Sequence, residues 1–278
     1  MKEFGTFETI WAPELPATES LDRIVSIYSK ELAGLNSHEA HALIAEKDSR
    51  LAALAKVLSK YPPQKRNEAY RVAIQGIANI FNYVADRSDV VTLKEDWKPE
   101  AHFMSLVADN FEDSDKVILD AACGTGVGLY ALANIFPDKL FVGYDIAERM
   151  IQKARQRMQS GTYSNTRLLV ADETSLPLND KSVDVTLVMH PAGVEGVMPQ
   201  HLLFPKGHSG VPFTLAKNLS ETRRVLKDDG ALITLQYLLH PGGRNLPGFD
   251  YKGSVVWSET ETFSGKPFSM AFFYRKSK

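Results

Sequence analysis

Residues 117–128, VILDAACGTGVG, place a glycine-rich turn directly after a short apolar run. The run at 116–121 fits a strand that is buried on both faces, and the apolar stretch at 127–136 that follows the turn fits a helix. Gly124 and Gly126 carry no Cβ atom, so a ligand can pack directly on backbone N–H groups. A strand, a glycine turn and a helix in this order are typical of nucleotide-binding α/β folds.

The same alternation continues toward the C-terminus. We expect further strands at 140–145, 167–171, 183–189 and 231–239, with helices at 147–159 and 213–227. Two last strands, 255–263 and 267–275, flank Ser264, Gly265 and Lys266 as a terminal antiparallel hairpin. These segments predict an α/β fold: a Rossmann-like, doubly wound, mostly parallel seven-stranded sheet that ends in a hairpin.

The first hundred residues have a different character. Residues 19–87 show a helical period, interrupted at Pro62 and Pro63, and a short helix is expected from Trp97 to Asn110. No strand is expected before residue 116. We therefore divide the chain into a helical N-terminal region, 1–96, and an α/β domain, 97–278, with an insertion at 192–217. The helical region is expected to be a lid over the pocket or a surface for a homodimer.

Composition limits the classes of partner. The formal net charge is −2, from 32 basic and 34 acidic residues, and no long basic run offers a surface for nucleic acid or an anionic membrane. We also expect no membrane span, because no stretch reaches about 18 apolar residues. The single cysteine favours a reducing, cytoplasmic location. His201 and His208 are too few for a metal site, and none is expected.

Two features of the glycine turn favour a cationic ligand over a dinucleotide. A G-x-G-x-x-G motif would need a third glycine at the position of Leu129, and no Walker motif follows. Asp120 at the end of the first strand would repel a phosphate, whereas it would attract the ammonium and sulfonium groups of S-adenosylmethionine. A nicotinamide-dependent oxidoreductase remains the alternative from another class.

Four ordered segments resemble one family: LDAACGTGVG, YDIAERMIQKAR, ADETSLPLNDKSVDVTLV and ETRRVLKDDGALITL. Over residues 100–240 the chain is similar to class I S-adenosylmethionine-dependent methyltransferases, in the small-molecule group that includes the methyltransferases of ubiquinone and menaquinone biosynthesis. The resemblance implies S-adenosylmethionine as cofactor and S-adenosylhomocysteine as product. It also implies a small-molecule acceptor from secondary metabolism or from quinone or lipid-type biosynthesis, and not a nucleic acid. A catalytically silent member that only binds the cofactor would show the same motifs.

The resemblance also implies roles for single residues. The methionine part of the cofactor would lie on the glycine loop at the end of the first strand, and the ribose hydroxyls on Asp145. The adenine would lie beside Ile146 and Met150, with its amino group toward Asp172 and Glu173. His190, at the end of the fourth strand, would lie nearest the transferred methyl group and is the candidate general base. The cofactor-binding set is therefore Asp120, Ala122, Gly124, Gly126, Asp145, Ile146, Met150, Asp172, Glu173 and His190.

Other interpretations of these residues stay open. Asp172 also fits an N-cap before Thr174, and His190 also fits a packing role before Pro191. Ala122 stands where the family has its first loop glycine. Residues 228–230, Asp-Asp-Gly, replace the usual Pro-Gly-Gly turn. The 14 residues at 240–253 look like a loop, whereas the family normally places a helix there. The acceptor, and whether N, O or C is methylated, stay undetermined.

Overall fold

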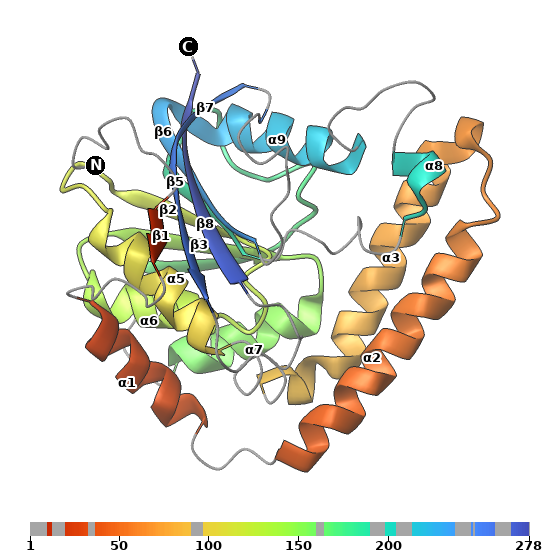
Figure 1. The fold of residues 1–278 in the computed structure, drawn as a ribbon, viewed down its shortest axis with the longest axis horizontal. Coiled ribbons are helices and arrows are strands. Elements are labelled where there is room, and N and C mark those ends of the chain that lie inside the picture. Colours follow the sequence, from red (N-terminus) through yellow and green to blue (C-terminus); the bar gives the residue numbers. More distant parts are fainter. Residues whose placement is uncertain are drawn as a thin grey trace.

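A computed structural model describes residues 10–12, 20–32, 37–89, 97–159, 164–189, 198–203, 213–236, 246, 248–258 and 268–277. Its centre is one eight-stranded sheet with the strand order β1-β7-β8-β6-β5-β2-β3-β4 (Figure 1). Strand β8 runs antiparallel to β6 and β7, and all other neighbouring strands pair in parallel. The expected Rossmann-like, doubly wound, mostly parallel sheet with two last strands in an antiparallel pair is confirmed, but the sheet has eight strands and not the predicted seven.

The strands after residue 116 lie close to their predicted positions. Two of them, β3 (Leu140–Asp145) and β5 (Val183–Met189), have the predicted bounds. The others are β2 (Val117–Ala121), β4 (Thr166–Val170), β6 (Leu226–Gln236), β7 (Phe249–Ser258) and β8 (Phe268–Lys276). The helices between them are α6 (Val127–Ile135), α7 (Glu148–Gln159) and α9 (Phe213–Val225).

Three predictions about strands need correction. Strand β1 (Ile10–Ala12) pairs with β7 at the sheet edge, although no strand was expected before residue 116. Strand β7 begins at Phe249 and not at residue 255, so part of the expected 240–253 loop is paired backbone. Strand β6 begins at Leu226 and not at residue 231. The predicted turn at 228–230 lies within this strand, where its pairing with β5 shifts register between Val183 and Val185. The predicted hairpin turn, 264–266, lies outside the described residues.

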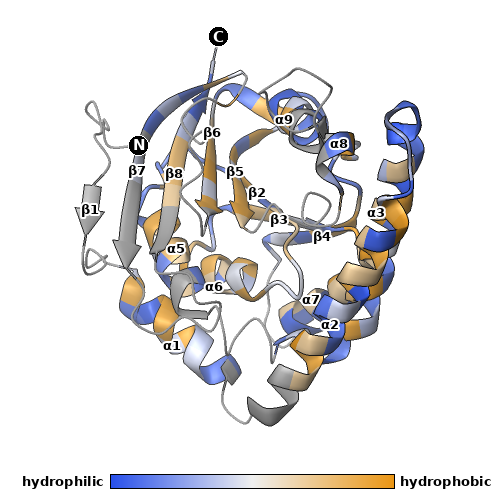
Figure 2. Cartoon of the chain, turned by 45° about the vertical axis from the view of Figure 1, so that its right-hand side comes forward, coloured by the Kyte–Doolittle hydropathy of each residue, from blue (hydrophilic) through white to orange (hydrophobic). Residues whose placement is uncertain are grey.

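Each face of the sheet is covered, which explains why its strands are apolar on both sides. Ile118 and Phe141 pack beneath α1 (Leu21–Leu32), α5 (Trp97–Asp109) and α6, whereas Leu119 and Val142 pack on the face that carries α9. Figure 2 shows the central strands β5 and β6 as largely hydrophobic. Helix α1 belongs to this core through Ile24, which has no exposed surface.

Helices α2 (Ser37–Leu58) and α3 (Arg66–Val84) form an antiparallel hairpin beside the sheet (Figure 1). The short helices η1 (Pro63–Lys65) and η2 (Ala85–Arg87) flank α3. The hairpin packs on α7 through Leu43, Val84 and Met150. At its other end Tyr70 and Ala73 share a small core with Leu202 of α8 (Gln200–Leu203). Two segments that were predicted separately, the helical region and the insertion, therefore touch each other.

No described helix has the length and apolarity to cross a membrane. Among the residues that the structure describes, no three His, Cys, Asp or Glu side chains are grouped so that they could hold a metal ion.

Candidate cofactor site

The glycine loop after β2 follows a left-handed path at three positions. Ala122, Gly124 and Gly126 have φ values of 56°, 54° and 75°. Glycine adopts this conformation without penalty, whereas alanine is strained there. Ala122 thus stands at a position whose backbone favours glycine, in agreement with the glycine that the resembled family has there.

The three loop glycines have different surroundings. A Cβ atom at Gly124 would meet no described atom within 4 Å, whereas one at Gly126 would lie 3.0 Å from Ala154 Cβ of α7. At Gly128 it would overlap Met104 Cε and lie 3.3 Å from the hydroxyl of Tyr28. Gly126 and Gly128 therefore allow close helix packing, and Gly124 leaves open space where a ligand can approach the backbone.

Asp145, at the end of β3, is tied to that loop. Its carboxylate accepts hydrogen bonds from the Gly124 N–H at 3.1 Å and from the Ala147 N–H at 2.8 Å. Burial raises the pKa of the carboxyl, and these backbone hydrogen bonds oppose the rise. A carboxylate has about four acceptor sites, so two remain for further donors such as a pair of hydroxyl groups.

The carboxyl group of Asp120, at the end of β2, is buried without a described hydrogen-bond donor. Its side chain is 1% exposed, and neither carboxylate oxygen has a hydrogen-bond partner in the part of the chain that the structure describes. Burial, together with the charges of Glu100 and Asp145, raises its pKa to about 8. Such a group is a strong acceptor for a cation or for N–H donors that enter the site.

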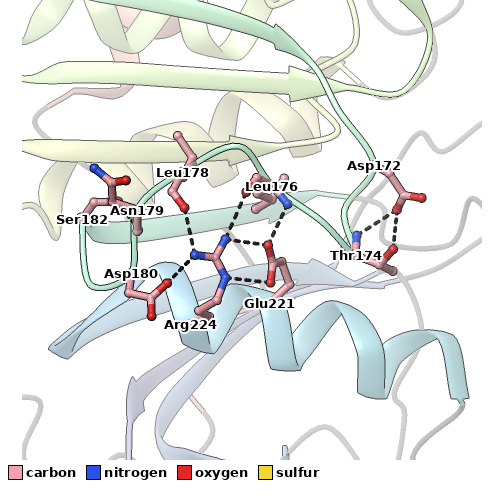
Figure 3. Close-up of polar contacts among 9 residues, drawn as sticks. All are labelled: Asp172, Thr174, Leu176, Leu178, Asn179, Asp180, Ser182, Glu221 and Arg224. Atoms are coloured by element: carbon pink, nitrogen blue, oxygen red, sulfur yellow. Dashed lines mark hydrogen bonds and ion pairs between the residues drawn. The ribbon is translucent and has the colours of Figure 1, made fainter.

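The residues after β4 form a tight turn (Figure 3). Asp172 Oδ1 accepts hydrogen bonds from the N–H and the hydroxyl of Thr174, each at 2.8 Å. This contact is an Asx turn and not the helix N-cap that was the alternative to adenine recognition, because the described residues after it form turns and no helix. Glu173 is half-buried. Burial raises the pKa of Tyr144, and the charge of Glu173 adds to the rise.

The remaining predicted residues lie in different surroundings. Ile146 is half-buried beside the Asp145 turn. The side chain of Met150 is buried between α7 and the helical hairpin, with its sulfur 3.5 Å from the hydroxyl oxygen of Ser88. His190 lies outside the described residues. Of the predicted residues, Asp145 and Gly124 are thus in contact, and Asp120 lies close enough for the charge of Asp145 to raise its pKa. The roles of the other residues around the adenine stay predictions.

Comparison with known proteins identifies the domain. A family model described as a methyltransferase domain matches residues 112–241, the segment that holds β2 to β6 and both loop aspartates. These residues form a class I S-adenosylmethionine-dependent methyltransferase domain. Such domains use S-adenosylmethionine as cofactor, which fits a loop with open space at Gly124 and the buried acid Asp120.

Individual relatives are distant. The chain is 28% identical over 168 residues to the demethylmenaquinone methyltransferase of Symbiobacterium thermophilum, over 58% of this chain and 59% of that protein. It is also 28% identical over 159 residues to the mouse U6 snRNA (guanine-N(2))-methyltransferase THUMPD2, over 53% of this chain and 27% of that protein. A solved S-adenosylmethionine-dependent methyltransferase from Aquifex aeolicus aligns over 78% of this chain and all of that one, with 16% identity and a TM-score of 0.47. The chain thus spans about three fifths of the length of the demethylmenaquinone methyltransferase and about a quarter of the length of THUMPD2.

An arginine latch holds the turn after β4 of the methyltransferase domain against α9 (Figure 3). The Arg224 guanidinium donates to the carbonyls of Leu178 at 2.8 Å and Leu176 at 3.0 Å, and it pairs with Asp180 and Glu221. Glu221 in turn accepts the Leu176 N–H at 2.7 Å, and its hydrogen bond with Arg224 lowers the pKa of its carboxyl. The latch fixes the segment that begins at Asp172.

We predict that Arg224→Met lowers the free energy of unfolding by about 2 kcal/mol, because several charge-assisted hydrogen bonds are lost while the alkyl stem is kept. Urea denaturation at pH 7 measures this loss. Arg155→Met is the matched control, since among the described residues Arg155 donates one hydrogen bond, to the Leu168 carbonyl at 3.1 Å on an exposed surface. We expect its effect to stay below about 0.5 kcal/mol. Equal losses in the two variants would contradict the latch.

Sequence reasoning missed three residues around the glycine loop. Arg157 of α7 donates to the Thr125 carbonyl and forms ion pairs with Glu31 of α1 at 3.0 Å and Asp89 at 2.8 Å. Tyr28 of α1 reaches Gly128 at the start of α6, and its hydroxyl holds Glu100 of α5. All three residues lie outside the four segments that resemble the family, so only the fold brings them together.

Proposed function

We propose that the chain is an enzyme that transfers the methyl group of S-adenosylmethionine to a small-molecule acceptor and releases S-adenosylhomocysteine. The observation that carries the proposal is the loop in which Asp145 accepts the N–H of Gly124, beside open space at Gly124 and the unpartnered acid Asp120. The match of a methyltransferase family model to residues 112–241 supports it.

The chain's residues fit the parts of this cofactor. Asp120 supplies negative charge for the ammonium of the methionine part, and Gly124 lets that part approach the backbone. Asp145 has acceptor sites left for the two ribose hydroxyls. Ile146, Met150, Asp172 and Glu173 are the adenine-side candidates, with Ala122 and Gly126 shaping the loop. The bound cofactor supplies a methyl group that its positive sulfur already activates.

In this proposal the protein acts mainly by alignment and by exclusion of water. The residues of the loop hold the donor in one orientation, and the acceptor is held on the far side of the methyl group. His190 is the candidate to accept a proton when the acceptor is a phenol or enol. An acceptor that is an amine or a stabilised carbanion needs little help from an acid or base.

We assign the choice of acceptor to the unit made by α2, α3 and α8. Helix α8 lies within the 192–217 insertion and packs on the hairpin, where the His201 ring contacts the Tyr61 carbonyl at 2.9 Å. The other end of the hairpin is fixed to α7, whose Arg149 N–H donates to Asn82 at 2.8 Å. This unit, within the proposed 1–96 region and the insertion, is proposed as a cover for the acceptor, with a homodimer surface as the alternative.

The net charge of −2 and the quinone-modifying relative favour a small acceptor over a nucleic acid. The matched RNA methyltransferase makes RNA the second candidate, and it is tested beside the first. The single cysteine supports a cytoplasmic location.

Calorimetry with S-adenosylhomocysteine and with NADH tests the cofactor. We expect heat of binding with the first and none with the second. Turnover is then measured as S-adenosylhomocysteine release with a demethylated naphthoquinol, a catechol and U6 snRNA as acceptors. Release with a small acceptor supports the proposal, and release with RNA alone overturns the choice of acceptor. Absence of binding heat with folded protein overturns the proposed function as a whole.

A further inference from the structure

A second buried carboxylate lies beside the glycine loop, outside the family motifs. Glu100, in the first turn of α5, is 4% exposed. Its Oε1 accepts a hydrogen bond of 2.9 Å from the hydroxyl of Tyr28, a residue of α1 with no exposed surface. A buried carboxylate that is held by a buried hydroxyl is fixed in position by both helices.

This pair lies at the start of α6. A Cβ atom at Gly128 would come within 3.3 Å of the Tyr28 hydroxyl, so Tyr28 and the carboxylate that it holds reach the first turn of the helix that opens from the loop. Helices α1 and α5 both pack on α6. Asp120 is near enough for the charge of Glu100 to raise its pKa.

We propose that Glu100, oriented by Tyr28, joins Asp120 in a two-carboxylate subsite for the ammonium group of the cofactor's methionine part. The unpartnered oxygens of Asp120 point to a ligand with N–H donors. An ammonium carries three N–H donors and one positive charge, so it can satisfy two carboxylates that otherwise repel each other in a buried place.

This inference extends the proposed cofactor site to helices that lie outside the matched segment, 112–241. It gives α1 and α5 a direct part in cofactor binding, in addition to their place in the core. It also explains why Tyr28 is a tyrosine: a phenylalanine would fill the same core position but could not hold Glu100.

Calorimetry with two ligands tests the subsite, which rests on the proposed function. S-adenosylhomocysteine carries the ammonium, whereas 5′-methylthioadenosine keeps the adenosine and the sulfur and lacks the amino-acid part. At pH 8.5, where Asp120 is largely ionised, we expect Glu100→Gln to weaken S-adenosylhomocysteine binding about 10- to 100-fold. Binding of 5′-methylthioadenosine should change less than about twofold, and Tyr28→Phe should show a smaller loss with the same selectivity.

Asp109→Asn is the matched control. Asp109 lies at the end of α5 that is far from the loop. Its carboxylate accepts a hydrogen bond of 2.6 Å from the hydroxyl of Ser20, the residue before α1, so it also joins the two helices. We expect no selective loss in this variant. If Glu100→Gln loses affinity equally for both ligands, or loses none, the subsite is wrong. The proposed function still stands in that case, provided that the wild type binds S-adenosylhomocysteine. If Glu100→Gln does not fold, the selectivity of Tyr28→Phe decides, and a wild type that binds neither ligand overturns both proposals.

Discussion

Replacing Asp145 with asparagine will weaken the binding of S-adenosylhomocysteine about a hundredfold or more. The carboxylate is proposed to accept both ribose hydroxyls while it accepts the N–H groups of Gly124 and Ala147. The amide of asparagine has one acceptor oxygen and no charge, so it cannot serve all four donors. Loss of two hydrogen bonds to a charged group corresponds to about 3 kcal/mol or more, and calorimetry at pH 7.5 measures it.

Asp138→Asn is the control for this change. Asp138 is an exposed residue whose carboxylate lies 3.7 Å from Lys116 Nζ, so the same substitution there removes a charge without touching the loop. We expect its affinity to stay within about twofold of wild type. If Asp145→Asn also stays within that range, the ribose role of Asp145 is wrong.

The parallel sheet could be predicted because its strands are short apolar runs with clear ends. The run at Leu140–Asp145 follows a lysine and ends on an aspartate, and the run at Val183–Met189 lies between a serine and a histidine. The bounds of both strands were predicted correctly. The position of Asp145 beside the loop follows from the same rule, since parallel strands place their carboxyl ends at one edge. Local sequence was therefore enough to predict the parallel strands and the position of Asp145 beside the loop.

Features that depend on distant contacts could not be predicted. Strand β1 has three residues, too few for a period, and its partner β7 lies more than 230 positions later. Glu100 falls in an ordinary amphipathic helix, and only the packing of α1 and α5 on α6 brings it and Tyr28 to the loop. The contact of α8 with Tyr70 likewise joins two segments that no local pattern connects.

Asp120→Asn will stabilise the ligand-free protein and weaken cofactor binding, with both effects depending on pH. In the folded protein the pKa of Asp120 is raised to about 8, whereas an unfolded aspartate titrates near 3.9. Between these values the folded state holds a proton that the unfolded state has lost, so this residue lowers stability progressively as pH rises from about 4 to 8. Asparagine does not titrate and removes that loss.

Denaturant unfolding of the ligand-free protein at pH 5 and pH 8 measures the difference. Relative to wild type, Asp120→Asn should gain about 3 to 4 kcal/mol between these two pH values, which is the stability that ionisation of Asp120 costs over this range. Comparing the two pH values cancels the cost of burying the asparagine amide itself. A constant difference would show that Asp120 titrates like an exposed aspartate.

Binding should show the opposite sign. Because the cofactor's ammonium is proposed to favour ionised Asp120, wild-type affinity for S-adenosylhomocysteine should rise nearly tenfold per unit from pH 6 to 7 and level off above pH 8, where most of the carboxyl is already ionised. Asp120→Asn should bind weakly and without this slope. The acid that is proposed to bind the cation is thus a group that destabilises the ligand-free protein, as expected where function and stability compete. A pH-independent affinity in wild type would separate Asp120 from the cation and leave its burial without a ligand to explain it.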